Sequence, residues 1–386
     1  MGSIIFITRA RVTDIGPGGR HRSYQIMHDL LSHFGAAQVH VHVLSLQDWR
    51  EQTHADAREP RISFSELCLN PLRALIDTGY TQTNYTPHGF AAHYAAYIAT
   101  LPQPLIAVVD DVRLTRILDI NAQRSIPTIL CPQNLETLDM LPAGSGRVRT
   151  RAHLLDFAAE TDTLRTLAAR LMISKTEAGF ISSLGMSAGY YPYLPAGQIG
   201  ARLREIRMQR AVSKRDRDRG LFLMLGSAMH ASTRHAFEHL VAQMRTHGLP
   251  AAMRIVLAGT GTQHIDITGL RGVEAHGWID QAELDRLLVA AQGVLVPQMH
   301  GFGAVTRISE MACAGIPTLT GRHAAWAINI PPGVQLVDDS WPTWLRAMEQ
   351  ISTQSPEVTG YDEWERAQPR PLASEIEHIL RERATP

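Results

Sequence analysis

The residues best suited to chemistry lie between Gly293 and Gly321, where a glycine-rich loop precedes a cation and a carboxylate. Val294 to Val296 is a short apolar run typical of a buried parallel strand, and helical spacing begins at Thr306 after proline and glycine residues. Arg307 and Glu310 are three positions apart, so a helix places both side chains on one face. A cation suits a phosphate and a carboxylate suits a sugar hydroxyl, so the segment predicts one cleft that binds both.

The loop before this helix is the second part of the predicted site. Gly301 and Gly303 lack Cβ atoms, which lets a ligand approach the backbone closely. The amides that open the helix carry partial positive charge suited to a phosphate. The alternative is that Arg307 and Glu310 form only a surface ion pair one helical turn apart.

This order of residues resembles the nucleotide-sugar signature of the retaining GT-B glycosyltransferases of family 4. That signature is a Gly-Phe-Gly loop followed by a helix that begins with Glu-Ala and ends with Ala-x-Gly-x-Pro-Val. The common form of the signature has a first Glu just before the loop, where this chain has His300. A second form has a basic residue three positions before the helix Glu, and Arg307 fits that position without a gap. The matching residues are Gly301, Phe302, Gly303, Glu310, Met311, Ala314, Gly315 and Pro317.

The resemblance implies an α/β protein with the GT-B fold, in which two Rossmann-like domains with parallel sheets face each other across a cleft. We expect an N-terminal acceptor-binding domain over residues 1–198 and a C-terminal nucleotide-sugar-binding domain over residues 199–360. The expected tail over residues 361–386 is a helix that crosses back onto the N-terminal domain.

The implied activity is transfer of a sugar from a nucleotide-diphosphate sugar, with UDP favoured, to a hydroxyl of a saccharide, a lipid-linked or another acceptor. The family's stereochemistry implies retention, and no cofactor or obligatory metal. Because the first Glu is absent, a catalytically inactive GT-B-like protein that binds a glycan or a protein partner remains the alternative. A sugar-nucleotide epimerase is disfavoured, because no carboxylates can be assigned to its sugar.

Length and composition set the class of protein. At 386 residues the chain exceeds one typical domain, so two domains of roughly 150–200 residues are expected. Hydrophobic residues make up 45% and charged residues 19%, as in globular proteins with a full core. The formal net charge is zero, which gives no support to a nucleic-acid partner.

The cysteines and the apolar runs indicate the compartment. Cys68, Cys131 and Cys313 are scattered without metal-ligand spacing, which favours free thiols in a reducing compartment. The first residues are too quickly polar for a signal peptide, and no run reaches the ~20 apolar residues of a membrane span. We therefore expect a cytoplasmic protein, with the inner face of the membrane as a further location.

The N-terminal part begins with a βαβ pattern, which predicts a parallel sheet. Its strands are Ile4 to Thr8 and Val39 to Leu44, with a helix from about Tyr24 to Phe34 between them. The turn after the first strand lacks the Gly-x-Gly-x-x-Gly spacing, which disfavours a nicotinamide enzyme. By the resemblance this turn meets the donor diphosphate or the acceptor, and the alternative is a flexible connection. Its candidate residues are Gly18, Gly19 and Arg20.

Polar residues follow two later strands of the same domain. Asp110 and Asp111 end the strand Leu105 to Val109, at the edge where open α/β sheets bind ligands, although a surface turn is an equal alternative. After the next strand the family often has His-Asn-x-Glu, and this chain has Gln in place of the His, followed by Asn134. Asp110, Asp111 and Asn134 are therefore assigned to the phosphate or acceptor side.

Two further motifs have local explanations. Ser174 and Glu177 match a capping box at the start of a helix, which requires no functional role. Residues 202–219 are rich in Arg and Lys, and such runs are usually a solvated helix surface or linker. Attraction to anionic lipid or to a phosphate-bearing acceptor is the alternative, which would allow peripheral membrane association.

The C-terminal part repeats the pattern of strand, glycine turn and helix. By the resemblance, Trp278 would lie near the nucleobase, with core packing as the alternative, and His300 would replace the missing first Glu, with an ordinary loop histidine as the alternative. The expected donor-binding residues are Gly226, Ser227, Gly259, Trp278, Ile279, Gly301, Phe302, Gly303, Ala304 and Thr306. The expected catalytic residues are Arg307, Glu310 and His300.

Overall fold

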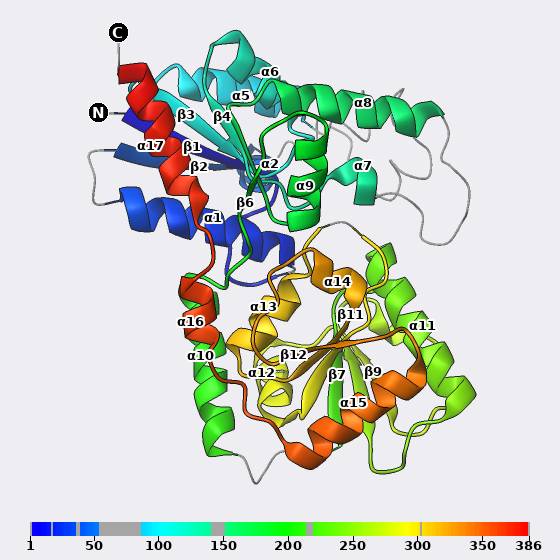
Figure 1. The fold of residues 1–386 in the computed structure, drawn as a ribbon. Coiled ribbons are helices and arrows are strands. Elements are labelled where there is room, and N and C mark those ends of the chain that lie inside the picture. The colour runs from blue at the N-terminus through cyan, green and yellow to red at the C-terminus, as the bar shows by residue number, and fades with distance from the viewer. Residues whose placement is uncertain are drawn as a thin grey trace. The chain divides into compact units, whose positions relative to one another are not determined.

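The computed structural model describes residues 2–16, 18–35, 39–53, 86–139, 151–213, 218, 220–301 and 303–384. The chain forms two compact units, each built on one sheet (Figure 1). Unit 1 comprises Met1–Leu141, Ser145–Pro192 and Pro369–Pro386, and unit 2 comprises Pro142–Gly144 and Tyr193–Gln368.

The sheet of unit 1 is parallel throughout, with the strand order β2-β1-β3-β4-β5-β6. Its described strands are β1 (Gly2–Thr8), β2 (Val39–Ser45), β3 (Leu105–Val109), β4 (Thr128–Leu130), β5 (Ala169–Met172) and β6 (Gly189–Tyr190). β1 and β3 are neighbours whose onward connections run to opposite sides of the sheet. This reversal marks the edge where a parallel sheet offers a ligand crevice.

Helices cover both faces of this sheet because successive residues of a buried strand point to opposite faces. Ile4 and Phe6 pack with residues of α1 and α17, whereas Ile5 and Ile7 pack with residues of α2, α5, α6 and α9. The described helices of unit 1 are α1 (Gly18–Phe34), α2 (Leu46–Thr53), α5 (His88–Ile98), α6 (Thr115–Gln123), α7 (Glu136–Asp139), α8 (Arg151–Arg165), α9 (Lys175–Ser183) and α17 (Pro371–Ala384).

Unit 2 repeats the design with the strand order β12-β11-β10-β7-β8-β9, again parallel. Its strands are β7 (Leu221–Leu225), β8 (Arg254–Ala258), β9 (Val273–Gly277), β10 (Gly293–Val296), β11 (Thr318–Gly321) and β12 (Val334–Val337). Its described helices are α10 (Gly197–Val212), α11 (Ala231–His247), η2 (Thr262–His264), α12 (Gln281–Ala290), α13 (Thr306–Cys313), α14 (Arg322–Trp326), α15 (Trp341–Gln354) and α16 (Tyr361–Arg366). The reversal of strand order falls between β7 and β10.

Three segments lie near the expected domain boundaries. The segment from Tyr193 to residue 198 is part of unit 2. Helix α17 packs into the core of unit 1 through Leu372 and Ile376. Helix α16, expected in the same tail, instead belongs to unit 2, because its Glu365 lies 2.7 Å from Arg204 of α10.

Ser174 caps the start of α9, as the predicted capping box requires of it. The Ser174 hydroxyl accepts a hydrogen bond from the Glu177 backbone N–H at the start of α9, as a helix cap does. The Glu177 carboxylate accepts the N–H of Leu135 at 2.6 Å, which ties α9 to the loop after β4. A residue expected to act only within its own helix therefore also fixes a distant loop.

Candidate functional site

The site in unit 2 is built around the loops that follow β7 and β10 at their carboxyl ends. Gly226 follows β7, and residues 297–305 connect β10 to α13. The Arg307 guanidinium lies directly against Gly226, so that a Cβ atom there would overlap it. Gly226 has φ +143°, and a Cβ on Gly259 would overlap the Gly226 carbonyl. The two glycines therefore make the space that Arg307 occupies.

Arg307 is an electrostatically unusual cation. Its side chain is partly buried, and burial lowers its pKa to about 10, an effect that Glu310 opposes. Within the described ranges no residue forms a hydrogen bond or ion pair with its guanidinium. Because an arginine with this pKa is protonated at neutral pH, it offers a positive charge to an anion at the sheet edge.

Glu310 is buried one helical turn further along α13. One of its carboxylate oxygens accepts a hydrogen bond from the hydroxyl of the buried Tyr193 at 3.0 Å. Burial and the Glu310 charge raise the pKa of Tyr193 well above its ordinary value, so this hydroxyl remains a donor. Sequence reasoning missed Tyr193, because no spacing pattern links residues 117 positions apart.

The loop before α13 is held by two hydrogen bonds. His323 Nε2 donates to the Gly301 carbonyl at 2.6 Å, and Gln298 Nε2 donates to the His300 carbonyl at 2.6 Å. Gly301 has φ +102°, a conformation that favours glycine. Phe302 lies outside the described residues. The other predicted loop residues, which are all partly buried, are Gly303, Ala304 and Thr306.

The predicted nucleobase side lies along β8 and β9. Trp278, directly after β9, has an exposed fraction of 73%, so the core-packing alternative is wrong for this residue. Ile279 is partly buried beside it. Ser227, after β7, caps its own turn by accepting a hydrogen bond from the Met229 backbone N–H at 3.3 Å. An exposed indole next to a glycine-lined sheet edge is available for stacking on a flat ring.

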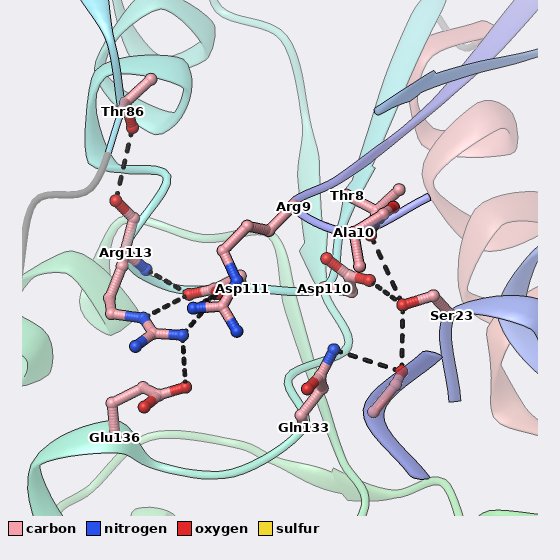
Figure 2. A network of polar contacts seen from close by, with 11 residues as sticks. Thr8, Arg9, Ala10, Ser23, Thr86, Asp110, Asp111, Arg113, Gln133 and Glu136 are labelled. Atoms are coloured by element: carbon pink, nitrogen blue, oxygen red, sulfur yellow. Dashed lines mark hydrogen bonds and ion pairs between the residues drawn. The ribbon is translucent and has the colours of Figure 1, made fainter. Parts of the chain in front are cut away.

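A second polar group lies at the β1/β3 edge of unit 1 (Figure 2). Gly18 and Gly19 form the first turn of α1, so the helix begins before the expected start at Tyr24. A Cβ on Gly19 would overlap the Gln133 side chain, whose Nε2 donates to the Gly19 carbonyl at 3.3 Å. Gly19 thus lets the loop after β4 approach the helix start.

Asp110 and Asp111 are both buried, so the surface-turn alternative is wrong. Burial raises the pKa of Asp110 to about 6, although the hydroxyls of Ser23 and Thr8 oppose the effect (Figure 2). Burial also acts on Asp111, but the charges of Arg113 and Arg9 outweigh it and hold the Asp111 pKa well below its ordinary value. The two neighbouring carboxylates therefore have opposite characters.

Asp111 serves a structural ion-pair network. Arg113 donates from Nε and Nη2 to the two Asp111 oxygens at 2.9 and 2.8 Å, and its Nη2 also lies 2.9 Å from Glu136 (Figure 2). The other predicted residues of this side are Arg20, whose Nη2 lies 3.5 Å from Gln47 Oε1, and the partly buried Asn134.

Replacing Asp111 with asparagine is expected to cost about 3–5 kcal/mol of unfolding free energy near neutral pH, because the buried Arg113 loses its bidentate anion and keeps only its contact with Glu136. The folded pKa of Asp111 is depressed, so its contribution is present above the unfolded value and is lost as the pH falls below about 4. Chemical denaturation at neutral and acid pH should therefore show a smaller cost in acid.

The matched control is Asp110→Asn, at the neighbouring carboxylate whose pKa is raised. This change should cost far less at neutral pH, where the wild-type group is a buried anion. Equal costs for the two variants would contradict the assignment of opposite characters.

The described arginines of the basic run form ion pairs and hydrogen bonds within unit 2. Arg204 and Arg207 pair with Glu365 and Asp362 of α16 at 2.7 and 3.0 Å, and Arg202 lies 3.8 Å from Asp285. Arg210 is buried and donates to the carbonyls of residues 288, 289 and 291. Lys214, Arg215, Arg217 and Arg219 lie outside the described residues.

No helix among the described residues is long and apolar enough to cross a membrane. Nor do they contain a group of three or more His, Cys, Asp or Glu side chains arranged to hold a metal ion.

Solved structures resemble the chain over nearly its whole length. Sucrose-phosphate synthase from Thermosynechococcus elongatus is 16% identical with a TM-score of 0.58, covering 92% of this chain and 90% of that one. Anabaena HepE in complex with UDP and glucose is 12% identical with a TM-score of 0.57, covering 99% of both chains. The α,α-trehalose-phosphate synthase (UDP-forming) from Burkholderia xenovorans, in complex with glucose-6-phosphate, is 10% identical with a TM-score of 0.52, covering 92% of this chain and 93% of that one. No family model and no curated protein matches the chain.

Proposed function

The chain has the GT-B fold that its sequence predicted, and we propose that it is a glycosyltransferase that uses a nucleotide-diphosphate sugar. The acceptor is a hydroxyl of a saccharide, a lipid-linked or another molecule, and the donor configuration is retained. The observation that carries the proposal is Arg307, a partly buried cation beside Gly226 with Glu310 one turn away.

The donor diphosphate binds at Arg307 and at the first amides of α13. Charge-assisted hydrogen bonds to phosphate are short and strong, and the helix start adds partial positive charge. Glu310, whose carboxylate already accepts a hydrogen bond from Tyr193, also accepts hydrogen bonds from the two ribose hydroxyls. Trp278 stacks on the nucleobase, for which uracil is favoured; two of the similar structures are named for UDP.

The reaction replaces one bond at the anomeric carbon of the donor sugar. The bond from this carbon to the diphosphate oxygen breaks, and a bond to the acceptor oxygen forms on the same face. The acceptor proton passes to an oxygen of the departing phosphate. Arg307 stabilises the negative charge that develops on the leaving diphosphate, as a preorganised cation does in a partly buried site.

The acceptor is assigned to the polar edge of unit 1. Gly18, Gly19 and Arg20 open α1 there, where helix-start amides suit a phosphate or a hydroxyl oxygen. Asp110 accepts hydrogen bonds at the same edge, and Asn134 lies in the loop after β4. Asp111 does not bind the acceptor in this proposal, because both of its oxygens accept hydrogen bonds from Arg113.

Membrane association through residues 202–219 stays a prediction. Four arginines of this run already have partners in unit 2. An electrostatic attraction to lipid would therefore depend on the basic residues between 214 and 219.

The proposal is tested by titrating UDP, GDP and ADP into the full chain by calorimetry. UDP is expected to bind, and Arg307→Ala should weaken its binding by about 10–100-fold, because charged hydrogen bonds to the diphosphate are lost. Arg286→Ala, at an exposed arginine paired with Glu283, is the matched control and should bind UDP like the wild type. Absence of heat with every nucleotide would favour the alternative, a GT-B-like protein that binds a glycan or a partner without catalysis.

A further inference from the structure

Four histidines of unit 2 gather beside the Gly301 loop. His235 and His239 lie on α11, His300 lies in the loop after β10, and His323 lies on α14. The His235 and His300 ring centroids are 5.8 Å apart, and His323 Nε2 donates to Gly301 at 2.6 Å. We call these four residues the histidine cluster.

The cluster offers hydrogen-bond donors to a ligand. No described residue forms a hydrogen bond with the rings of His235 and His300. Burial lowers the pKa of His300, and the nearby His235, His323 and His239 lower it further. His300 is therefore mostly neutral at neutral pH, and it gains a proton readily only when an anion enters.

The negative charges near the cluster are few in the described part of unit 2. Asp339, an exposed residue after β12, is the one that acts against the lowering of the His300 pKa. Asp338, next to it, is paired with Arg322 of α14 at 3.0 Å. A neutral imidazole offers one N–H donor and one acceptor, whereas a protonated imidazole offers two donors, so protonation makes these rings suited to an anionic acceptor.

The direction of the donor places its sugar at this cluster, an argument that rests on the proposed function. The diphosphate lies between the ribose and the sugar. With the ribose at Glu310 and the diphosphate at Arg307, the sugar lies beyond Arg307 from Glu310. That side is the beginning of α13 and the loop that carries His300.

We propose that the histidine cluster selects a donor sugar that carries a carboxylate, namely a hexuronic acid. The carboxylate accepts hydrogen bonds from the imidazoles of His300 and His235, and its charge favours their protonated forms. Binding of such a donor is therefore coupled to proton uptake, which the uncharged form of the same sugar does not share.

The test compares UDP, UDP-glucose and UDP-glucuronic acid by calorimetry at about pH 6 and about pH 8, on either side of the ordinary histidine pKa. UDP-glucuronic acid is expected to bind about 10-fold or more tightly than UDP-glucose at the lower pH, since a charged hydrogen bond is worth about 1.5–3 kcal/mol. This preference should shrink at the higher pH. UDP alone corrects for any pH dependence of the diphosphate.

Two variants locate the effect. His300→Gln and His235→Gln should each reduce the preference for UDP-glucuronic acid over UDP-glucose, and thermal melting shows that each variant remains folded. His247→Gln, at the exposed end of α11 outside the cluster, is the matched control. Variants that bind both donors like the wild type would refute a role for the cluster.

The possible failures are distinguishable. If UDP binds but the two donors bind equally at both pH values, the inference is overturned and the proposed function stands. If the preference for the uronate donor is present but does not change with pH, the histidines are not its source and the inference also fails. If no nucleotide binds, the proposed function falls and the inference falls with it.

Discussion

Arg307→Ala is expected to slow nucleotide-sugar turnover by about 100-fold or more, the cost of removing one preorganised group that stabilises developing negative charge. The same change should leave the melting temperature of the ligand-free protein equal or higher. Burial disfavours the Arg307 cation, and the Glu310 charge offsets this effect only in part, since the Arg307 pKa remains lowered. Turnover of UDP-sugar and thermal melting measure the two effects separately.

Gly226→Ala provides an independent test of the same contact. The new methyl group would overlap the guanidinium end of Arg307, a flexible side chain that can be displaced, and φ +143° is strained for alanine. Turnover should therefore fall as in Arg307→Ala, with a stability loss of about 1–3 kcal/mol. Gly248→Ala, at a left-handed glycine whose Cβ would meet nothing within 4 Å, is the matched control for strain alone. Full turnover in Gly226→Ala would contradict the role of Arg307.

Glu310→Gln is expected to weaken binding of UDP by about 10–100-fold, because two hydrogen bonds lose their charged acceptor. Glutamine still offers a carbonyl oxygen to the Tyr193 hydroxyl, so the fold should be retained. Glu310→Ala would strand that buried hydroxyl and cost about 1–3 kcal/mol of stability as well, so glutamine is the cleaner variant. Calorimetry with UDP and thermal melting distinguish these outcomes.

The ribose assignment has its own control. The wild type should bind UDP that lacks the 2′-hydroxyl more weakly than it binds UDP. Glu310→Gln should bind the two nucleotides about equally, because both changes remove the same hydrogen bond, that between the 2′-hydroxyl and the carboxylate. Tyr193→Phe should weaken UDP binding less than Glu310→Gln, since it releases the carboxylate without removing it. If Glu310→Gln and removal of the 2′-hydroxyl reduce the binding free energy additively, Glu310 does not contact the ribose.

Patterns within single elements were predictable from the sequence. Arg307 and Glu310 share a helix face because the helical period is fixed by the backbone, and the apolar run Val294 to Val296 forms a strand because it is buried on both faces. The glycine after β7 signalled a tight turn beside a sheet edge. These properties depend on neighbours within a few positions.

The burial and the pKa values of individual side chains were decided only by packing. The sequence does not distinguish Asp110 from Asp111, yet Arg113 and Arg9 lower the pKa of one while burial raises that of the other. Trp278 was as consistent with a core position as with an exposed one. The start of α1 at Gly18 was missed because glycine is a weak helix former, and tertiary contacts override that preference.

The sequence by itself therefore determined two parallel α/β units and the helix that carries the cation and the carboxylate. The tertiary structure alone decided which distant residues meet: the Arg307 guanidinium lies against Gly226, the Tyr193 hydroxyl donates to Glu310, and the His235 ring lies beside that of His300. The physical reason is that local spacing fixes the face of one helix, whereas contacts between residues far apart in the chain arise only when sheets and helices pack.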